Sequence, residues 1–393
     1  MARGRTASKI QKKLNFLCFG EPFTGKSTFA SQFAYMHNED GSPMRVLYID
    51  AESGSIDNYL DEIEANGVDL RNIYILYTQS LGEVLDYIEK VKNNEDFYEL
   101  DEDGEETDVV VVDADGKNFR ADAIVIDGAS VLYTAAQQGL LEFSKKRARV
   151  RADGNGLVGE EKLVAIEGSS LEMKDWGALR YKGANLCLAL LGTGIHSMIT
   201  CREDDEKETV KGSNGQFTSV PTGKKIPSGF KDLDYNTHTV VRFYRDDEDN
   251  VIADVVKDRS GVHPKEKVVD PTLLDWQVVI DGNKGKTKFV LKNNLDTAVA
   301  TEQEIYSAEV MSNATKSMSK SEMEKAKEVS SEPSGASDNS VEIKTQIKDA
   351  IKKLSPVDKK SMKEKLTDAG LPTEYTKITD CDVLQKILAI VSE

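Results

Sequence analysis

The sequence predicts an α/β fold in which a mainly parallel central sheet is flanked by helices. Short apolar runs alternate with helical patterns from residue 14 to about residue 290, an order of elements typical of this class. Several runs are almost continuously apolar, as in A-I-V-I at residues 123–126, and such runs suit strands that are buried on both faces. The first run is followed by a glycine-rich turn and an amphipathic segment, which predicts a strand–loop–helix unit at the start of the fold.

Seven segments combine an apolar composition with flanking turn residues, and each is predicted to be a strand. The predicted strands are 14–19, 46–49, 73–77, 123–126, 195–200, 239–244 and 251–256.

The composition divides the chain into an arm, a large domain, a linker and a C-terminal module. Residues 1–13 carry five basic side chains and no acid, so we expect a mobile basic arm. The α/β domain covers residues 14–298 and contains an acidic insert at about residues 93–120, where the turn sequence D-G predicts a hairpin. Residues 299–340 are rich in Ser, Lys and Glu and are predicted to be a disordered linker. Residues 341–393 recover a helical periodicity and predict a three-helix module.

The overall composition is that of a globular protein with an acidic excess. The chain has 393 residues, with 51 Lys and Arg against 68 Asp and Glu, and a formal charge of −17. This charge argues against coating nucleic acid or anionic membranes. No stretch approaches the roughly 20 apolar residues that cross a bilayer, and the N-terminus lacks the apolar core of a signal peptide. Four scattered cysteines without metal-binding spacing indicate reduced thiols, so we expect a cytoplasmic protein without membrane contact.

The negative charge is concentrated in three short runs. Residues 95–115 hold eleven acids and no base, and residues 203–208 and 246–249 each carry a net charge of −4. The rest of the chain carries about +2, and it includes the N-terminal arm and five basic residues between Lys145 and Arg151. The overall charge therefore does not exclude DNA, and these two basic segments are where we expect it to bind.

The most specific motif is a complete G-x-x-x-x-G-K-S sequence at residues 20–27. Its glycines allow backbone N–H groups to surround phosphates at the start of a helix, where the helix dipole favours anions. Lys26 supplies a positive charge for the β- and γ-phosphates, and Ser27 offers a hydroxyl to Mg²⁺. We therefore predict that the chain binds ATP with Mg²⁺. The predicted nucleotide contacts in this segment are Gly20, Glu21, Pro22, Phe23, Thr24, Gly25, Lys26, Ser27 and Thr28.

An aspartate is expected at the end of a hydrophobic strand, where it organises the water shell of Mg²⁺. Two segments compete for this role, V-V-V-V before Asp113 and A-I-V-I before Asp127. Asp113 is followed by a hairpin-turn sequence inside the acidic insert, whereas Asp127 is followed by Gly128 and a helical pattern. The turn chemistry favours Asp127 as the Mg²⁺ residue, and Asp113 remains the alternative.

The second predicted strand ends in L-Y-I-D-A-E, which places Glu52 just beyond its carboxyl end. The carboxyl ends of parallel strands meet at one edge of a sheet, so Glu52 is expected on the same edge as the phosphate loop. A carboxylate there could orient and deprotonate the water that attacks the γ-phosphate. The competing interpretation is a solvent-exposed loop glutamate.

The order of these motifs resembles the RecA-type ATPase core. The G-x-x-x-x-G-K-S loop, D-A-E at residues 50–52 and the A-I-V-I-D strand follow one another, and D-A-E stands where RecA-like ATPases carry their catalytic glutamate. Residues 195–202, I-H-S-M-I-T-C-R, resemble the next strand of phage-encoded AAA-family nucleotide-binding proteins. Within this group the chain looks most like the Sak-type single-strand annealing ATPases of bacteriophages. The resemblance implies a RecA-like P-loop NTPase core.

This resemblance implies four further site residues. Thr200 and Arg202 would sense the γ-phosphate, although the acids that follow Arg202 offer it a local ion pair instead. Residues 257–261, K-D-R-S-G, resemble the K-x-R-x-G element that RadA places at a subunit interface, so Lys257 and Arg259 would reach a neighbour's nucleotide. An arginine supplied by a neighbour ties hydrolysis to assembly, and a homo-oligomer is expected. The alternative for Arg259 is a surface salt bridge.

The resemblance also implies that single-stranded DNA binds at two regions. The first is the basic run 145–151 with the glycine-rich turn after it, and the second comprises residues 211–217 and 222–225. Flexible basic loops with an aromatic residue suit contacts with single strands, and the competing interpretation is a solvated basic helix end. For the C-terminal module, residues 341–393, a replication or recombination partner, DNA and no ligand all remain open.

The sequence therefore predicts a RecA-like P-loop ATPase, phage-encoded and located in the host cytoplasm, that binds single-stranded DNA and promotes annealing in recombination or replication. The alternative is a nucleotide-dependent helicase loader or switch that works through protein partners. A small-molecule P-loop kinase is less favoured, because it would need an arginine-rich lid and an acceptor pocket. Only about 13 residues precede the first strand, so we expect a ring or short oligomer rather than a strand-exchange filament.

Overall fold

The chain divides into two units, Met1–Leu295 and Asp296–Glu393. The first unit contains the central sheet and all the site residues predicted from the sequence. The structure, a computed structural model, describes residues 7–101, 106–211, 217–290, 295–317, 347, 365–366 and 381–392.

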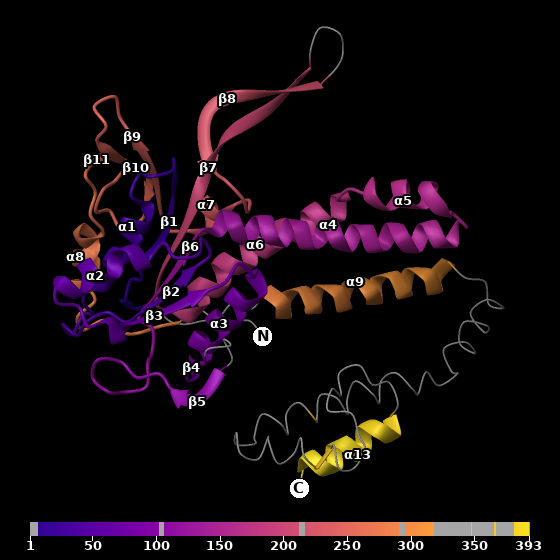
Figure 1. Cartoon of the computed structure of the whole chain (residues 1–393), viewed down its shortest axis with the longest axis horizontal. Coiled ribbons are helices and arrows are strands. Elements are labelled where there is room, and N and C mark those ends of the chain that lie inside the picture. The colour runs from indigo at the N-terminus through magenta and orange to yellow at the C-terminus, as the bar shows by residue number, and fades with distance from the viewer. Residues whose placement is uncertain are drawn as a thin grey trace. The chain divides into compact units, whose positions relative to one another are not determined.

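The first unit is built on a mainly parallel sheet flanked by helices (Figure 1). The parallel strands follow the order β9-β1-β7-β6-β2-β3, and β10 and β11 continue antiparallel beyond β9. The predicted α/β class, a mainly parallel sheet flanked by helices, is confirmed. Each predicted strand overlaps a strand of this sheet, and the bounds are β1 Asn15–Gly20, β2 Val46–Asp50, β3 Ile73–Tyr77, β6 Ala123–Asp127, β7 His196–Lys211, β9 Thr239–Arg245, β10 Val251–Asp258 and β11 Lys267–Val269.

Strand β7 is much longer than predicted. Beyond Arg202 it leaves the sheet and pairs with β8 (Phe217–Pro227) as an antiparallel ribbon that projects from the domain (Figure 1). This extension begins with the charged sequence E-D-D-E-K-E, whose side chains are exposed or half-buried. A ribbon with both faces in solvent lacks the apolar pattern that identifies a buried strand, which is why the sequence predicted only the first part.

Helices cover the two faces of the sheet with separate apolar layers. Helices α1 and α2 and the segment around Trp276 pack on one face, where Phe16 and Trp276 meet edge-to-face with ring centroids 5.1 Å apart. Helices α3, α4 and α6 pack on the other. The helical bounds in this unit are α1 Lys26–Ser31, η1 Gln32–Tyr35, α2 Asp57–Ala65, η2 Leu70–Asn72, α3 Leu81–Asn93, α4 Ala129–Gly154, α5 Gly159–Glu167, α6 Met173–Thr193, α7 Leu233–Asn236, η3 Leu273–Trp276 and α8 Gln277–Asp281.

The acidic insert contains a short hairpin, in which β4 (Tyr98–Leu100) pairs antiparallel with β5 (Glu106–Val110). Phe97 and Phe119 flank the hairpin, and both are buried with ring centroids 5.5 Å apart. This aromatic contact attaches the insert to the layer that contains α3. Residues 102–105 lie outside the described part.

The N-terminal segment is attached to the domain from Ile10 onward, in contrast to the predicted mobile arm. Ile10 pairs with Thr287, the Gln11 N–H donates to the Thr287 carbonyl at 3.0 Å, and the Lys12 N–H donates to Asn283 Oδ1 at 2.7 Å. Backbone pairing fixes these residues regardless of their basic side chains. Residues 1–6 lie outside the described range.

The second unit contains α9 (Leu295–Ser317) and α13 (Cys381–Ser392). Helix α9 occupies the start of the segment predicted to be a disordered linker, and residues 318–340 are not described. Helix α13 lies where the last helix of the C-terminal module is predicted, and the other predicted helices fall almost entirely outside the described residues. No helix in the described part of the chain is long and apolar enough to span a bilayer.

Candidate active site

The phosphate loop connects the end of β1 to α1. Gly20 lies opposite Phe243 of β9, and a Cβ added to Gly20 would stand 1.9 Å from the Phe243 carbonyl oxygen. A side chain at this position would therefore break the junction between strand and loop. The Lys26 ammonium donates to the carbonyl oxygens of Gly20, at 3.2 Å, and Glu21. Burial lowers the pKa of Lys26, with nearby Glu52 opposing the shift.

A cleft of about 690 Å³ opens above this loop, at the carboxyl ends of β1, β2 and β6 and beside the part of β7 where that strand leaves the sheet. The loop residues 20–27, Glu52, Asp127, Thr200 and Arg202 all line it. The structure thus brings together five predicted parts of the site that are scattered along the sequence. The volume is within the range typical of small-molecule sites.

Asp127 ends β6 at the bottom of the cleft, with only 1% of its surface exposed. Its carboxylate accepts hydrogen bonds from Tyr48 Oη at 2.7 Å, from Ser55 Oγ at 2.7 Å and from Thr200 Oγ1. Burial and the adjacent Asp127 raise the pKa of Tyr48 well above its usual value, which keeps this phenol a proton donor. The three hydroxyls hold the carboxylate in one orientation beside the phosphate loop.

Glu52 stands on a turn that Asp50 organises. The buried Asp50 carboxylate accepts from the backbone N–H groups of Glu52 at 2.9 Å and Ser55 at 2.6 Å. The Glu52 carboxylate pairs with Arg202 at 3.3 Å. A Cβ added to Gly128 would stand 2.6 Å from Glu52 Cγ, so the glycine after Asp127 provides the space that Glu52 occupies.

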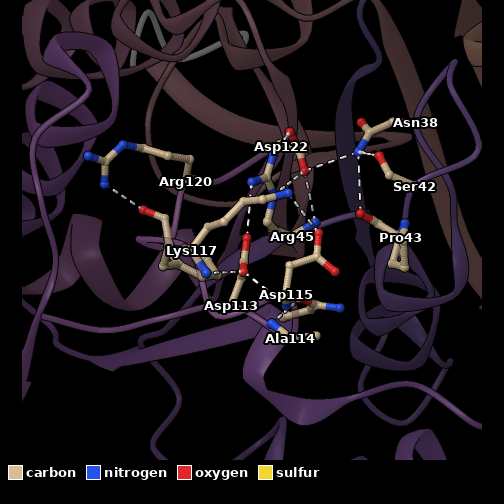
Figure 2. Close-up of polar contacts among 12 residues, drawn as sticks. Asn38, Ser42, Pro43, Arg45, Asp113, Ala114, Asp115, Lys117, Arg120 and Asp122 are labelled. Carbon is tan, nitrogen blue, oxygen red and sulfur yellow. Dashed lines mark hydrogen bonds and ion pairs between the residues drawn. The ribbon is translucent and has the colours of Figure 1, made fainter.

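Asp113, the alternative Mg²⁺ residue, lies outside the cleft in a polar network at the base of the acidic insert (Figure 2). Its Oδ2 is 3.3 Å from Arg45 Nη1, and Arg45 also pairs with Asp122 at 2.8 Å. Its Oδ1 accepts from the N–H groups of Asp115 and Lys117, which closes a separate turn at residues 113–117, after the β4–β5 hairpin. The contacts of Asp113 are therefore those of a structural residue.

Thr28, a predicted nucleotide contact, is not among the residues that line the cleft. Its hydroxyl donates to Tyr59 Oη at 3.0 Å, so the first turn of α1 directs this side chain toward α2. Phe23, at the tip of the loop, lines the cleft while 92% of its surface is exposed.

Lys257 and Arg259 lie at the opposite edge of the sheet from the phosphate loop. Asp258 pairs with Thr239, at the level of Phe16 near the beginning of β1, whereas the loop leaves the other end of that strand. Lys257 Nζ donates to backbone carbonyls around the end of α7, including that of Asp234 at 2.7 Å. These bonds give Lys257 a structural role that the sequence did not predict.

The predicted basic DNA loop, residues 145–151, is part of helix α4. Arg147 pairs with Asp175 and Arg151 with Glu172, and Lys145 also pairs with two glutamates. Within the described part of the chain, Lys146 and Arg149 form no ion pair and are exposed. For most of this run, the structure therefore favours the competing interpretation, a basic helix end, over a flexible DNA-binding loop. Of the second predicted region, residues 212–216 lie outside the described residues.

Sequence reasoning missed several residues that line the cleft or hold its side chains in place. Tyr48 and Ser55 hold Asp127, and Glu203 and Lys225 of the ribbon form one wall. Tyr48 carries a weak signal, a single hydroxyl in an otherwise apolar strand before D-A-E. Lys225 carries none, because only the pairing of β8 with β7 brings it to the cleft.

The donor groups in the cleft fit a magnesium nucleotide. Lys26 and the turn between Gly20 and Gly25 suit phosphates, and the Ser27 hydroxyl and Asp127 carboxylate are oxygen ligands of the kind Mg²⁺ prefers. Mg²⁺ binds through few protein oxygens together with phosphates and waters. The described residues contain no group of three or more His, Cys, Asp or Glu arranged to hold a metal ion.

Comparison with known proteins gives only distant matches. No protein-family model matches the sequence, and no curated protein matches it. Among solved structures, a KaiC-like protein from the hyperthermophilic archaeon Pyrococcus horikoshii is 16% identical, with 68% of this chain and 99% of that chain covered at a TM-score of 0.34. The sheet order and the phosphate loop of this chain define its class, an α/β protein with a phosphate-binding loop at the end of its first strand.

Proposed function

We propose that this chain is a Mg²⁺-dependent ATPase that works on single-stranded DNA as a homo-oligomer. One observation carries the proposal, namely that the phosphate loop, Asp127, Glu52, Thr200 and Arg202 meet in a single cleft. Hydrolysis needs a phosphate cradle, a Mg²⁺ carboxylate and a base for water at one place, and these residues supply all three.

Each residue has a chemical task in this proposal. Lys26 places its charge against the β- and γ-phosphates, and Ser27 and Asp127 hold Mg²⁺. The metal ion, when bound, neutralises charge on the phosphates as the terminal bond breaks. Glu52 orients the attacking water and takes its proton. Thr200, a residue of β7, donates to Asp127 and accepts from the Gly128 N–H at 2.9 Å. In this proposal its contacts change with the γ-phosphate, so the change passes to β7.

The proposed assembly rests on the position of Arg259. This side chain is exposed, and no ion pair involves it among the residues that the structure describes. It lies at the sheet edge opposite its own phosphate loop, so it would serve the nucleotide of a neighbouring copy. Lys257 is bound to the turn after α7, and we therefore assign the role in the neighbour's site to Arg259 alone.

The DNA part of the proposal follows from the projecting ribbon and from exposed cations on α4. The ribbon begins at the cleft. In this proposal it couples the nucleotide bound in the cleft to a DNA strand that contacts the outer part of the ribbon. Lys146 and Arg149 add positive charge that no acid neutralises within the described residues. Annealing of complementary single strands in phage recombination or replication is the activity we propose for this surface.

The test is the rate of ATP hydrolysis and the mass by light scattering, each measured with and without single-stranded DNA. The proposal expects turnover that rises with DNA and a mass that is a multiple of one chain. Binding of ATP without turnover would favour a nucleotide-dependent switch or loader. A rate of ATP hydrolysis that is the same with and without DNA, together with no annealing of complementary strands, would overturn the proposed role on DNA and leave the ATPase proposal intact.

A further inference from the structure

The root of the β7–β8 ribbon forms one wall of the candidate active site. Asp205 of β7 pairs with Lys225 of β8, and both side chains line the cleft together with Glu203. Sequence reasoning assigned Lys225 to a DNA-binding loop. The structure instead places it in the same cavity as its own phosphate loop.

Among the described residues that line the cleft, the cations are Lys26, Arg202 and Lys225. Each is held by an acceptor of the protein itself. Lys26 donates to loop carbonyls, Arg202 pairs with Glu52, and Lys225 Nζ lies 2.9 Å from Asp205 Oδ1. A bound triphosphate brings more negative charge than these acceptors, so it would compete for all three cations.

A chain of ion pairs connects the ribbon to the phosphate loop. Lys225 Nζ is 3.7 Å from Glu203 Oε1, and Glu203 is bound by Arg242 through Nε at 2.8 Å and Nη2 at 3.4 Å. Arg242 in turn lies 3.8 Å from Glu21 of the phosphate loop. Glu203 and Arg242 are mostly buried, with 10% and 20% of their side chains exposed, so this contact fixes the ribbon root against β9.

We propose that Lys225 binds the terminal phosphate of a nucleoside triphosphate held by the phosphate loop of the same chain. On binding, Lys225 exchanges Asp205 for the phosphate, and the Glu203–Arg242 contact keeps the rest of the root in place. The ribbon is then held against the cleft with a triphosphate and released with a diphosphate. This inference rests on the proposed nucleotide site and adds a residue that distinguishes the two nucleotides.

Lys224 provides a matched control. It is the neighbour of Lys225 on the same strand, and successive side chains of a strand point to opposite faces. Its ammonium pairs with Glu206 at 3.2 Å, and it does not line the cleft. Lys224→Ala therefore removes the same charge from the ribbon root without touching the nucleotide.

The first experiment measures the affinity of the full chain for Mg²⁺ with ADP and with a non-hydrolysable ATP analogue. Lys225→Ala is expected to lower the affinity for the triphosphate analogue by about tenfold or more, which is the size of a charge-assisted hydrogen bond. The affinity for ADP should change less than twofold. Lys225→Arg should retain most of the preference for the triphosphate analogue over ADP, and Lys224→Ala should retain all of this preference. Equal losses for both nucleotides, or an unchanged Lys225→Ala protein, would overturn the inference.

A second readout follows the ribbon itself by hydrogen exchange at residues 203–211 and 217–227. The triphosphate analogue should slow exchange there relative to ADP in the wild type, and Lys225→Ala should abolish the difference. Identical exchange with both nucleotides in the wild type would contradict the inference while leaving the ATPase proposal intact. A wild-type chain that binds neither nucleotide would instead overturn the proposed function, and this inference with it.

Discussion

Asp127 and Asp113 each follow an apolar run of similar composition, yet the fold gives them different surroundings. Asp127 ends a central strand, and three hydroxyls hold its carboxylate at the bottom of the cleft. Asp113 follows β5 of the peripheral hairpin, where its oxygens accept from Arg45 and from its own turn (Figure 2). Both are buried, with 1% and 3% of their surface exposed, so burial alone does not distinguish them.

The difference lies in what surrounds each carboxylate. A guanidinium and backbone N–H groups bind the Asp113 carboxylate and close the turn at residues 113–117, as expected for a structural residue. Hydroxyl donors orient Asp127 without introducing a cation, so its negative charge remains available for Mg²⁺. Of the two aspartates, only Asp127 lies where its strand ends beside the phosphate loop, which is the position our proposal requires of the Mg²⁺ residue.

The largest effect that separates the two aspartates is expected in turnover. Asp127→Asn should lower the rate of ATP hydrolysis by about three orders of magnitude, because the metal contributes several kcal/mol of charge stabilisation in the transition state. Asp113→Asn should leave the rate within twofold of the wild type. Steady-state phosphate release at saturating ATP and Mg²⁺ measures both. The reverse ranking would show that Asp113 holds the metal.

Glu52→Gln sharpens the comparison by testing a carboxylate that holds no metal. Turnover should fall by about a hundredfold, since general base catalysis supplies an effect of this order, while the affinity for ATP stays near that of the wild type. Binding measured by equilibrium titration and turnover measured by phosphate release separate the two effects. A loss of binding without loss of turnover would place Glu52 outside the chemistry.

Arg45→Met tests the structural side of the comparison. It leaves Asp113 and Asp122 without their guanidinium partner, and we expect a loss of about 2 kcal/mol in the free energy of unfolding. Arg71→Met is the control, because its ion pair with Asp69 is exposed to solvent and contributes little to stability. Denaturant unfolding gives both values. Equal stabilities of the two variants would contradict a structural role for this network.

The smallest effect is expected from Tyr48→Phe, which removes one of the hydroxyls on Asp127. Turnover should fall by about two- to tenfold, the range of a single hydrogen bond of 0.5–1.5 kcal/mol. Tyr74→Phe is a suitable control, since its hydroxyl bonds a backbone carbonyl near the acidic hairpin. If both variants keep full turnover, the orientation of Asp127 does not depend on Tyr48.

The sequence predicts the sheet well because its central strands are continuously apolar, as in Val46–Asp50 and Ala123–Asp127. It predicts the phosphate loop because that motif is contiguous. The same reasoning fails where the signal depends on tertiary contacts. The ribbon strand β8 is largely exposed to solvent, so it lacks the apolar pattern that identifies a buried strand.

Two other features could not be predicted for physical reasons. The place of Lys225 in the cleft depends on the register of β8 against β7, which no local pattern encodes. The basic run 145–151 has the composition of a DNA-binding loop, but α4 brings Arg147 to Asp175, which lies far along the chain. Charge patterns predict where cations occur, and only the packing of helices decides which of them are neutralised.

The most direct test of the account is phosphate release from ATP by the full chain, compared with Lys26→Ala under the same Mg²⁺ concentration. The cleft geometry predicts steady turnover in the wild type and a loss of binding and turnover in the variant, because Lys26 supplies the charge inside the phosphate loop. Turnover that survives unchanged in Lys26→Ala would show that hydrolysis occurs elsewhere and would contradict the proposed function.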